Sequence, residues 1–142
     1  MDKEIKLQVG VKAILKNGLG QFLLLIKSGE KYPEIGKDIW DIPGGRINPG
    51  VPLLENLKRE IFEETGLELK SAPKLIAAQD ILRIEGLHVV RLTYVANIEG
   101  DVKVDGNEHT GYKWVSLDEL KQVEVLDIYL KALLDEGMLD NI

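Results

Sequence analysis

The strongest structural signal in the chain lies in the segment GGRINPGVPLLENLKREIFEETGL, residues 44–67. The Asn-Pro-Gly sequence before Pro52 is typical of a helix entry, and Gly66 supplies a glycine stop about four turns later. Between these two points, four apolar residues recur at helical spacing, namely Leu53, Leu54, Leu57 and Ile61. The segment therefore predicts a helix over residues 52–65 that follows a glycine turn.

Three glutamates occupy the last two turns of this helix, and two of them flank its apolar face. On a helical projection Glu60 and Glu64 lie at the margin of that face, whereas Glu63 lies further round. Carboxylates at the edge of a core repel one another and lose hydration, and Arg59 supplies one guanidinium against three of them. A divalent cation that prefers hard oxygen ligands, Mg²⁺ or Mn²⁺, would balance this cluster. The alternative is a solvated acidic surface without metal.

A glycine turn precedes the helix in the sequence WDIPGG, residues 40–45. Two adjacent glycines allow backbone conformations and close approaches that other residues exclude. Because the turn stands directly upstream of the acidic helix, its backbone can join the carboxylates around a metal ion and a phosphate.

The remaining periodicities predict five strands and two further helices. Alternating apolar residues predict a half-buried strand over 5–15, and apolar runs predict strands over 22–26, 74–82, 87–99 and 111–115. Residues 28–38 are polar and predict a loop. A capping-box sequence at 116–119 predicts a short helix, and apolar residues at helical spacing predict an amphipathic helix over 123–136. Strands and helices interspersed without a linker indicate one α/β domain over residues 1–142.

Composition excludes several classes of protein. The 142 residues are 44% hydrophobic and 30% charged, as in globular proteins rather than disordered or fibrous ones. The net charge of −6 disfavours general binding to nucleic acids, which are also negatively charged. Cysteine is absent, which excludes disulfides and thiolate metal sites. Without a signal-peptide pattern or an apolar run near about 18 residues, the sequence predicts a cytoplasmic protein that does not enter membranes.

Residues 45–67 resemble the sequence box of the Nudix (MutT-like) hydrolases, G-x5-E-x7-R-E-U-x-E-E-x-G-U, where U is a bulky aliphatic residue. Gly45 opens the box, and REIFEETGL, residues 59–67, completes it at the family spacing. The likeness extends outside the box, because WDIPGG precedes it and Glu108 precedes a strand containing Trp114. From about residue 7 to residue 134 the order of the predicted elements also resembles that of the family. The resemblance implies an α/β fold of the Nudix type, an α/β/α sandwich around a mixed β-sheet.

The resemblance also implies a chemistry and the residues that perform it. The family cleaves a nucleoside diphosphate linked to another group by attack of water on phosphorus, with divalent ions neutralising charge and lowering the pKa of a bound water. Mg²⁺ is the implied cofactor, and Mn²⁺ is expected to substitute for it. The implied ligands are Glu60, Glu63, Glu64, Glu108 and the carbonyl of Gly44. Either Glu60 or Glu108 would activate the water, and Arg59 belongs to the same catalytic group.

One position departs from the family pattern, because Val51 stands where the box has its first glutamate. In the family that glutamate mostly orients the box arginine, here Arg59, while the later glutamates hold the metal. The resemblance therefore implies weaker support for Arg59 with an intact metal site. Glu55 lies one helical turn before Arg59, and we hypothesise that it supplies a substitute salt bridge.

Several residues outside the helix are candidates for substrate binding. Lys27 and Arg46 would hold phosphates, with an ordinary surface charge as the alternative. Trp40 and Tyr32 would stack on a base, unless they belong to the core. His109 would act as a base or contact a phosphate, unless it is merely solvated in a polar loop.

The glycine turn would complete the substrate site, because the backbone at Gly44 and Gly45 is open to close approach. Three basic residues of the later strands, Arg83, His88 and Arg91, are expected at the surface and have no assigned role.

Two functional classes fit these observations. We expect a Mg²⁺-dependent pyrophosphohydrolase of a small nucleotide, in the nucleoside triphosphate or nucleotide sugar class. The alternative is a non-catalytic Nudix domain that senses nucleotides or binds a partner, which Val51 favours and the box glutamates disfavour. The isoprenoid isomerase branch of the family is disfavoured, since it uses a catalytic cysteine. The oligomeric state stays open, and a homodimer is one option because many relatives pair.

Overall fold

The computed structural model describes residues 4–27, 38–106 and 109–142. Its elements in chain order are β1 (Lys6–Lys16), β2 (Phe22–Lys27), β3 (Ile39–Asp41), β4 (Gly44–Arg46), α1 (Leu53–Thr65), β5 (Lys74–Ile81), β6 (Leu87–Asn97), β7 (His109–Val115), α2 (Leu117–Leu120) and α3 (Ile128–Asp135). All five expected strands are present, with ends shifted by one or two residues. The loop expected over 28–38 falls almost entirely outside the described residues. The described helices are all too short or too polar for a transmembrane segment.

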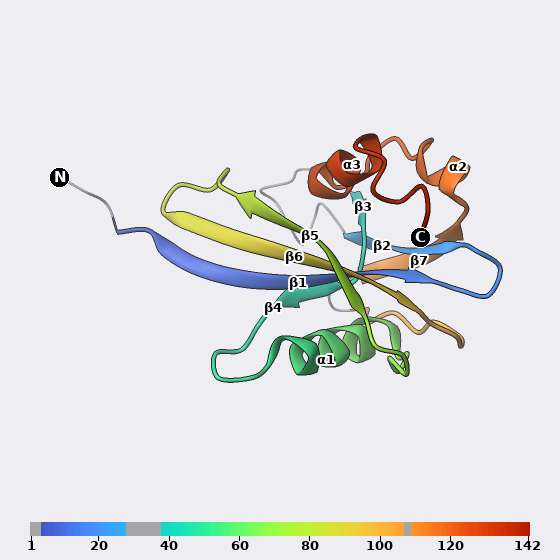
Figure 1. Cartoon of the computed structure of the whole chain (residues 1–142), viewed down its shortest axis with the longest axis horizontal. Helices are drawn as coiled ribbons and strands as arrows, with labels where there is room; N and C mark the ends of the chain where they lie inside the picture. Colours follow the sequence, from blue (N-terminus) through green and yellow to red (C-terminus); the bar gives the residue numbers. More distant parts are fainter. Residues whose placement is uncertain (1–3, 28–37, 107–108) are drawn as a thin grey trace.

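The strands form one seven-stranded mixed sheet with the order β3-β2-β1-β6-β5 along its main path. β1 and β6 pair in parallel, from Lys6 opposite Leu87 to Lys16 opposite Asn97. The other pairings are antiparallel, and off the main path β4 joins β1 while β7 joins β2. Figure 1 shows α1 on one side of the sheet and α2 with α3 on the other. The expected α/β/α sandwich around a mixed sheet is therefore confirmed.

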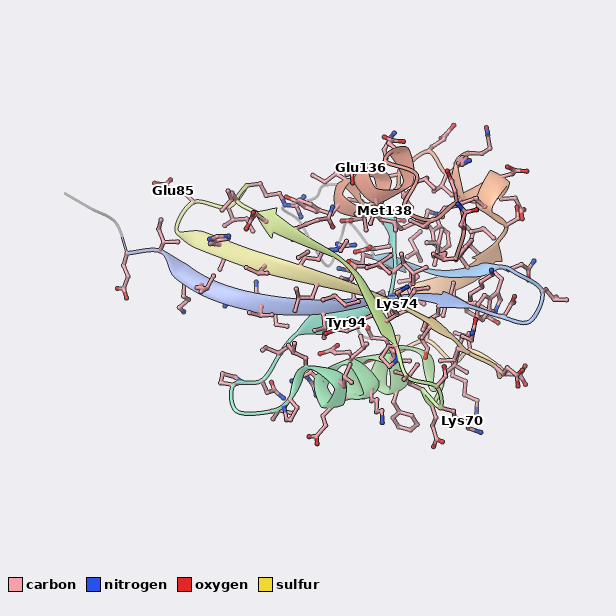
Figure 2. The ribbon with its side chains drawn as sticks, viewed as in Figure 1. Lys70, Lys74, Glu85, Tyr94, Glu136 and Met138 are labelled. Carbon is pink, nitrogen blue, oxygen red and sulfur yellow. The ribbon has the colours of Figure 1, made fainter. Side chains whose placement is uncertain are left out.

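Each face of the sheet carries its own hydrophobic core. On one face Leu57 of α1 packs in a cluster with Tyr94 of β6. On the other face Leu130 of α3 packs in a cluster with Leu24 of β2. Figure 2 shows Tyr94 on the α1 side of the sheet and Met138 on the α3 side. The sheet is thus the shared middle layer of two cores.

Strand β1 is buried on both faces rather than on one. Residues 10–15 are all buried, because Val11 belongs to the core on the α1 side and Ile14 to the core on the α3 side. The expectation of a half-buried strand is therefore wrong for this half of β1. The alternation of apolar residues in β1 correctly predicts which side chains share a face of the sheet. It does not show that helix α3 and its neighbours cover the second face as well.

Helix α1 ends as expected, because Gly66 adopts the left-handed conformation with φ 73° and donates its N–H to the Phe62 carbonyl. Its buried face is displaced from the expected one. Leu57 and Ile61 are fully buried, whereas the two leucines of the first turn are 37% and 42% exposed. The helix packs on β1 and β4 through its middle and last turns, and its buried residues there include Glu64.

Helix α3 begins at Ile128, so the helix expected over 123–136 is too long at its start. The preceding segment runs beside β3, where the Trp40 N–H donates to the Val125 carbonyl and the Asp127 N–H donates to the Trp40 carbonyl. The Asp127 carboxylate then caps α3 by accepting hydrogen bonds from the N–H groups of residues 129 and 130. The apolar residues before Asp127 thus serve a pairing between segments rather than a helix.

Candidate active site

The glycine turn is held against the central strand of the sheet. Gly44 and Gly45 of β4 pair with Lys12 and Val11 of β1. Gly44 has φ 142°, and a Cβ built on it would lie 2.1 Å from the Val11 carbonyl oxygen. Only glycine fits this position, because both the conformation and the contact exclude a side chain.

The Glu64 carboxylate is buried beneath this turn. Its residue is 2% exposed, and its Oε2 accepts a hydrogen bond of 2.6 Å from the Gly44 N–H. Burial raises the pKa of Glu64 to about 8; Lys12 and the Gly44 hydrogen bond oppose this rise, and the nearby Glu60 adds to it. A cation beside Glu64 would offset the cost of its negative charge.

The Glu60 carboxylate covers the second glycine of the turn. A Cβ on Gly45 would lie 2.7 Å from Glu60 Oε2 and 2.9 Å from Oε1, so the missing side chain leaves room for this carboxylate. The Glu60 side chain is 13% exposed. The structure thus brings Glu60 and Glu64 together at Gly44 and Gly45.

The remaining expected ligands are placed differently. The Glu63 side chain is 53% exposed, and its Oε2 lies 3.4 Å from Arg59 Nη1. Glu108 lies outside the described residues. Within residues 4–27, 38–106 and 109–142, no three His, Asp or Glu side chains stand close enough together to hold a metal ion.

Arg59 is held by three neighbours on its own helix. Its Nη1 lies 3.1 Å from Glu60 Oε1 and 3.4 Å from Glu63 Oε2, and its Nη2 donates to Asn56 Oδ1 at 3.0 Å. Glu55 is exposed and is not among the contacts of Arg59 in the described structure, so the hypothesis of a salt bridge from Glu55 is wrong. Sequence reasoning did not identify Asn56 as a partner of Arg59. The signal that could have indicated it is its position next to Leu57, on the side of the helix that is buried.

His109 lies in strand β7 and not in a solvated loop. It is 1% exposed, and its Nε2 lies 3.5 Å from Glu64 Oε1. Burial, followed by the charges of Lys27 and Lys12, lowers the pKa of His109 to about 4, so the ring is neutral at pH 7. Its Nδ1 has no hydrogen-bond partner among the described residues. His109 is therefore a buried neighbour of Glu64 and not the solvated loop residue of the alternative interpretation.

A buried charge network adjoins the glycine turn on the α3 side of the sheet. The Asp41 carboxylate lies 3.2 Å from Lys12 Nζ, 3.2 Å from Arg91 Nη2 and 3.7 Å from Lys27 Nζ. Burial alone would raise the pKa of Asp41, yet these three cations hold it well below its usual range. Lys12 Nζ also donates to the Ile42 carbonyl at 3.2 Å, which ties the network to the start of the turn.

Arg91 connects this network to helix α3. It is 4% exposed, and its Nη1 lies 3.0 Å from the Asp127 carboxylate that caps the helix. The expectation that Arg91 lies at the surface is therefore wrong. Sequence reasoning missed Asp41, Lys12 and Arg91 because their partners are distant in the chain. The available signal was a charged residue between apolar neighbours in a strand.

The other substrate-binding candidates are only partly brought together. Lys27 is close to the site through Asp41, whereas Arg46 is exposed at the end of β4. Trp40 is half-buried beside the α3-side core, and Lys113 Nζ lies 4.3 Å from its ring centre. Trp40 and Lys113 also border a surface hollow of about 320 Å³. Tyr32 lies outside the described residues.

The donor groups at the glycine turn suit a hard divalent cation. Glu60 and Glu64 offer carboxylate oxygens, which Mg²⁺ and Mn²⁺ prefer over softer ligands. Burial raises the pKa of Glu64 even though Lys12 opposes the rise, so a bound cation would stabilise the ionised form of this carboxyl. Glu60 and Glu64 would hold such an ion, and Glu63, in the last turn of the same helix and beside Arg59, is a further candidate ligand.

Comparison with known proteins gives a consistent result. The chain matches the family model for the NUDIX domain over residues 6–134. It is 33% identical over 100 residues to a putative 8-oxo-dGTP diphosphatase of Bacillus subtilis, covering 68% of this chain and 65% of that protein. It is 34% identical over 125 residues to the asymmetrical bis(5'-nucleosyl)-tetraphosphatase of Rattus norvegicus, covering 82% of this chain and 78% of that protein.

Solved structures agree with the sequence relatives. The crystal structure of the MutT protein from Methanosarcina mazei Go1 superposes with a TM-score of 0.83 at 29% identity, covering 99% of both chains. The MutT NUDIX hydrolase from Burkholderia pseudomallei superposes with a TM-score of 0.77 at 28% identity, covering 92% of this chain and 97% of that one.

Proposed function

Because the chain belongs to the NUDIX family of MutT-like hydrolases, which act on phosphoric anhydride bonds, we propose that it is a Mg²⁺-dependent pyrophosphohydrolase of a small nucleotide. Water would attack phosphorus in a nucleoside diphosphate linked to another group. The nucleoside triphosphate class is the first candidate for the substrate, and nucleotide sugars are the second.

The observation that carries this proposal is the meeting of Glu60 and Glu64 at Gly44 and Gly45. A polyphosphate is an anion and would be repelled by these carboxylates alone. A bound divalent ion neutralises phosphate charge and lowers the pKa of a water that attacks phosphorus. The glycine turn has no side chains that would keep a phosphate or a metal ion away from these two carboxylates.

The chain's own residues would act mainly by positioning. The Gly44 N–H fixes the Glu64 carboxylate, and Arg59 holds Glu60 beside the turn. Glu60 or Glu108 would accept the proton of the attacking water. Lys27 and Arg46 remain candidates for phosphate contacts, and Trp40 for stacking on a base.

The relatives support a nucleotide substrate without selecting one. Their names include 8-oxo-dGTP diphosphatase, asymmetrical bis(5'-nucleosyl)-tetraphosphatase and RNA pyrophosphohydrolase. These substrates share a nucleoside joined to a chain of phosphates, while the bases and the second groups differ. We therefore propose recognition of the phosphate chain at the glycine turn and leave the choice of base to residues outside it.

The test is a panel of nucleotides incubated with the purified protein and Mg²⁺, with identification of the products. We expect release of phosphate or pyrophosphate, loss of turnover with EDTA, and a decrease in kcat of about 100-fold or more in Glu60→Gln and Glu64→Gln. Glu55→Gln is the matched control, because Glu55 is an exposed glutamate of the same helix.

Two results would contradict the proposal. Turnover that persists without a divalent ion would exclude the metal role of Glu60 and Glu64. Tight nucleotide binding with no product from any member of the panel would instead support the alternative, a non-catalytic sensor domain.

A further inference from the structure

Helix α1 contains a buried asparagine whose contacts converge on the arginine beside the carboxylates. Asn56 is fully buried, with 0% exposure, although asparagine is a poor helix former and its amide is costly to bury. It stands one turn before Arg59 and faces the loop that leads into the helix. Such a residue needs compensation by hydrogen bonds.

All the polar atoms of the Asn56 amide have partners. Its Nδ2 donates to the Val51 carbonyl at 2.8 Å and to the Pro52 carbonyl at 2.9 Å. Its Oδ1 accepts from the Asn48 N–H at 2.9 Å and from Arg59 Nη2 at 3.0 Å. The orientation of the amide is therefore fixed, since a flipped amide would face two carbonyls with its oxygen and two donors with its nitrogen.

This arrangement makes Asn56 a rigid acceptor for one side of the Arg59 guanidinium. The other side of the guanidinium lies 3.1 Å from Glu60 and 3.4 Å from Glu63. A fixed acceptor limits the rotation of a long, flexible arginine side chain, so the direction of Nη1 toward the carboxylates depends on Asn56.

We propose that Asn56 is a positioning residue that orients Arg59 and, through it, Glu60 and Glu63. It thereby takes the place of the glutamate that the Nudix box has at the position of Val51. A neutral amide does so without adding a further negative charge next to the two carboxylates. The inference rests on the proposed metal role of Glu60 and Glu63, but the contact between Asn56 and Arg59 is tested separately.

The experiment compares Asn56→Ala with the double variant Asn56→Ala/Val51→Glu, which restores the glutamate of the family box. Two properties are measured without nucleotide: Mn²⁺ affinity by electron paramagnetic resonance, and the ¹⁵N–¹H signals of the Arg59 guanidinium by NMR. For Asn56→Ala we expect Mn²⁺ affinity to fall about 10-fold or more and the Arg59 signals to move to those of a mobile arginine. In the double variant, the added glutamate at position 51 is expected to restore most of the Mn²⁺ affinity and the Arg59 signals of an ordered guanidinium.

Thr65→Val is the matched control for lost stability. Thr65 is fully buried in the same helix, and its hydroxyl donates to the Ile61 carbonyl and accepts from the Leu67 N–H. The substitution removes buried hydrogen bonds without touching Arg59. We expect Tm to fall while Mn²⁺ affinity and the Arg59 signals stay as in the wild type.

Asn56→Asp keeps the test decisive if Asn56→Ala does not fold, since it retains an acceptor for Arg59 and loses the two amide donors. Its Arg59 signals should remain those of an ordered guanidinium. Unchanged Arg59 signals in Asn56→Ala, mobile ones in Asn56→Asp, or no recovery in the double variant would overturn the inference. Glu60→Gln separates the two proposals, because unchanged Mn²⁺ affinity in that variant would contradict the metal site. The Arg59 signals of Asn56→Ala and Asn56→Asp would still test the contact between Asn56 and Arg59.

Discussion

Gly45 leaves the space that the Glu60 carboxylate occupies over the turn. A methyl group at residue 45 would meet both carboxylate oxygens at 2.7 and 2.9 Å, and Glu60 would have to move. We predict that Gly45→Ala lowers kcat and Mn²⁺ affinity about 10-fold or more, with a small change in Tm.

The matched control for this prediction is Gly18→Ala in the β1–β2 hairpin, where a Cβ would meet no atom within 4 Å. Enzyme assays, Mn²⁺ titration and thermal unfolding of both variants provide the check. Equal activity of the two alanine variants would show that the carboxylate position does not matter.

Asp41 predicts how stability depends on pH. Burial opposes its ionisation, but Arg91, Lys12 and Lys27 keep the pKa of the folded state well below its usual range. Because the unfolded pKa is about 3.9, the carboxylate contributes stability above that pH and loses it progressively as the pH falls. We predict that the free energy of unfolding falls more steeply between about pH 5 and pH 2 in the wild type than in Asp41→Asn.

At neutral pH, Asp41→Asn should cost about 3–5 kcal/mol, because it leaves buried cations with less compensation. Urea unfolding at several pH values measures both effects. Asp135→Asn, which removes an exposed carboxylate paired with Lys131, should leave the pH profile nearly unchanged. Parallel pH profiles for the wild type and Asp41→Asn would contradict the role of this network.

Among the elements, helix α3 has a cap with two functions. The Asp127 carboxylate accepts hydrogen bonds from the first helical N–H groups and pairs with the buried Arg91 at 3.0 Å. Ser116 caps α2 with a capping box but has no such partner. We predict that Asp127→Ala costs roughly 3 kcal/mol or more, and Ser116→Ala about 1 kcal/mol, in urea unfolding.

Asp127→Asn divides the two contributions of this cap. It retains the capping oxygen and loses the charge opposite Arg91, so its cost should lie between those of the two alanine variants. Equal costs for Asp127→Ala and Ser116→Ala would mean that the pair with Arg91 adds nothing.

The elements differ in how far the sequence determines them. Helix α1 follows from local signals, since Gly66, the apolar spacing and the box all lie within residues 44–67. Glu60 and Glu64 could be predicted to meet the glycine turn for the same reason. The start of α3 could not, because Val123 and Leu126 continue the helical spacing of α3 although this segment pairs with β3, a contact between distant segments.

The short strands β3 and β4 and the buried charged residues could not be predicted from the sequence either, because local patterns do not indicate them. β3 and β4 have three residues each, too few to show a period of two. Lys12 and Arg91 lie in strands that looked exposed on one face, and only the position of α3 shows that this face is covered. Asn56 lacks any motif, so its role emerged from its contacts.

At the scale of the whole molecule, the sheet joins two cores that should unfold together. The protein's two tryptophans report on opposite sides, since Trp114 packs against the α1-side core and Trp40 against the α3-side core. The variants Trp40→Phe and Trp114→Phe each retain one tryptophan. We predict that, in each variant, urea unfolding followed by the fluorescence of that tryptophan has the same midpoint as unfolding followed by far-UV circular dichroism.

Leu57→Ala extends this prediction, because it removes a buried side chain from the α1 side alone. It should lower the midpoint seen by both tryptophans, at a cost of about 2–5 kcal/mol. Leu19→Ala, in an exposed hairpin position, should move neither. A shift confined to Trp114 would indicate that the two cores unfold independently.

The parallel pairing of β1 with β6 determines when β1 can form its part of the sheet during synthesis of the chain. Residues 6–16 leave the ribosome well before residues 87–97, and no tight hairpin can join two parallel strands. The apolar side chains of β1 must therefore wait, with one strand edge bare, until most of the chain has been translated. During this interval aggregation competes most strongly with folding. The yield of folded protein should therefore fall when synthesis is slow or when chaperones are scarce.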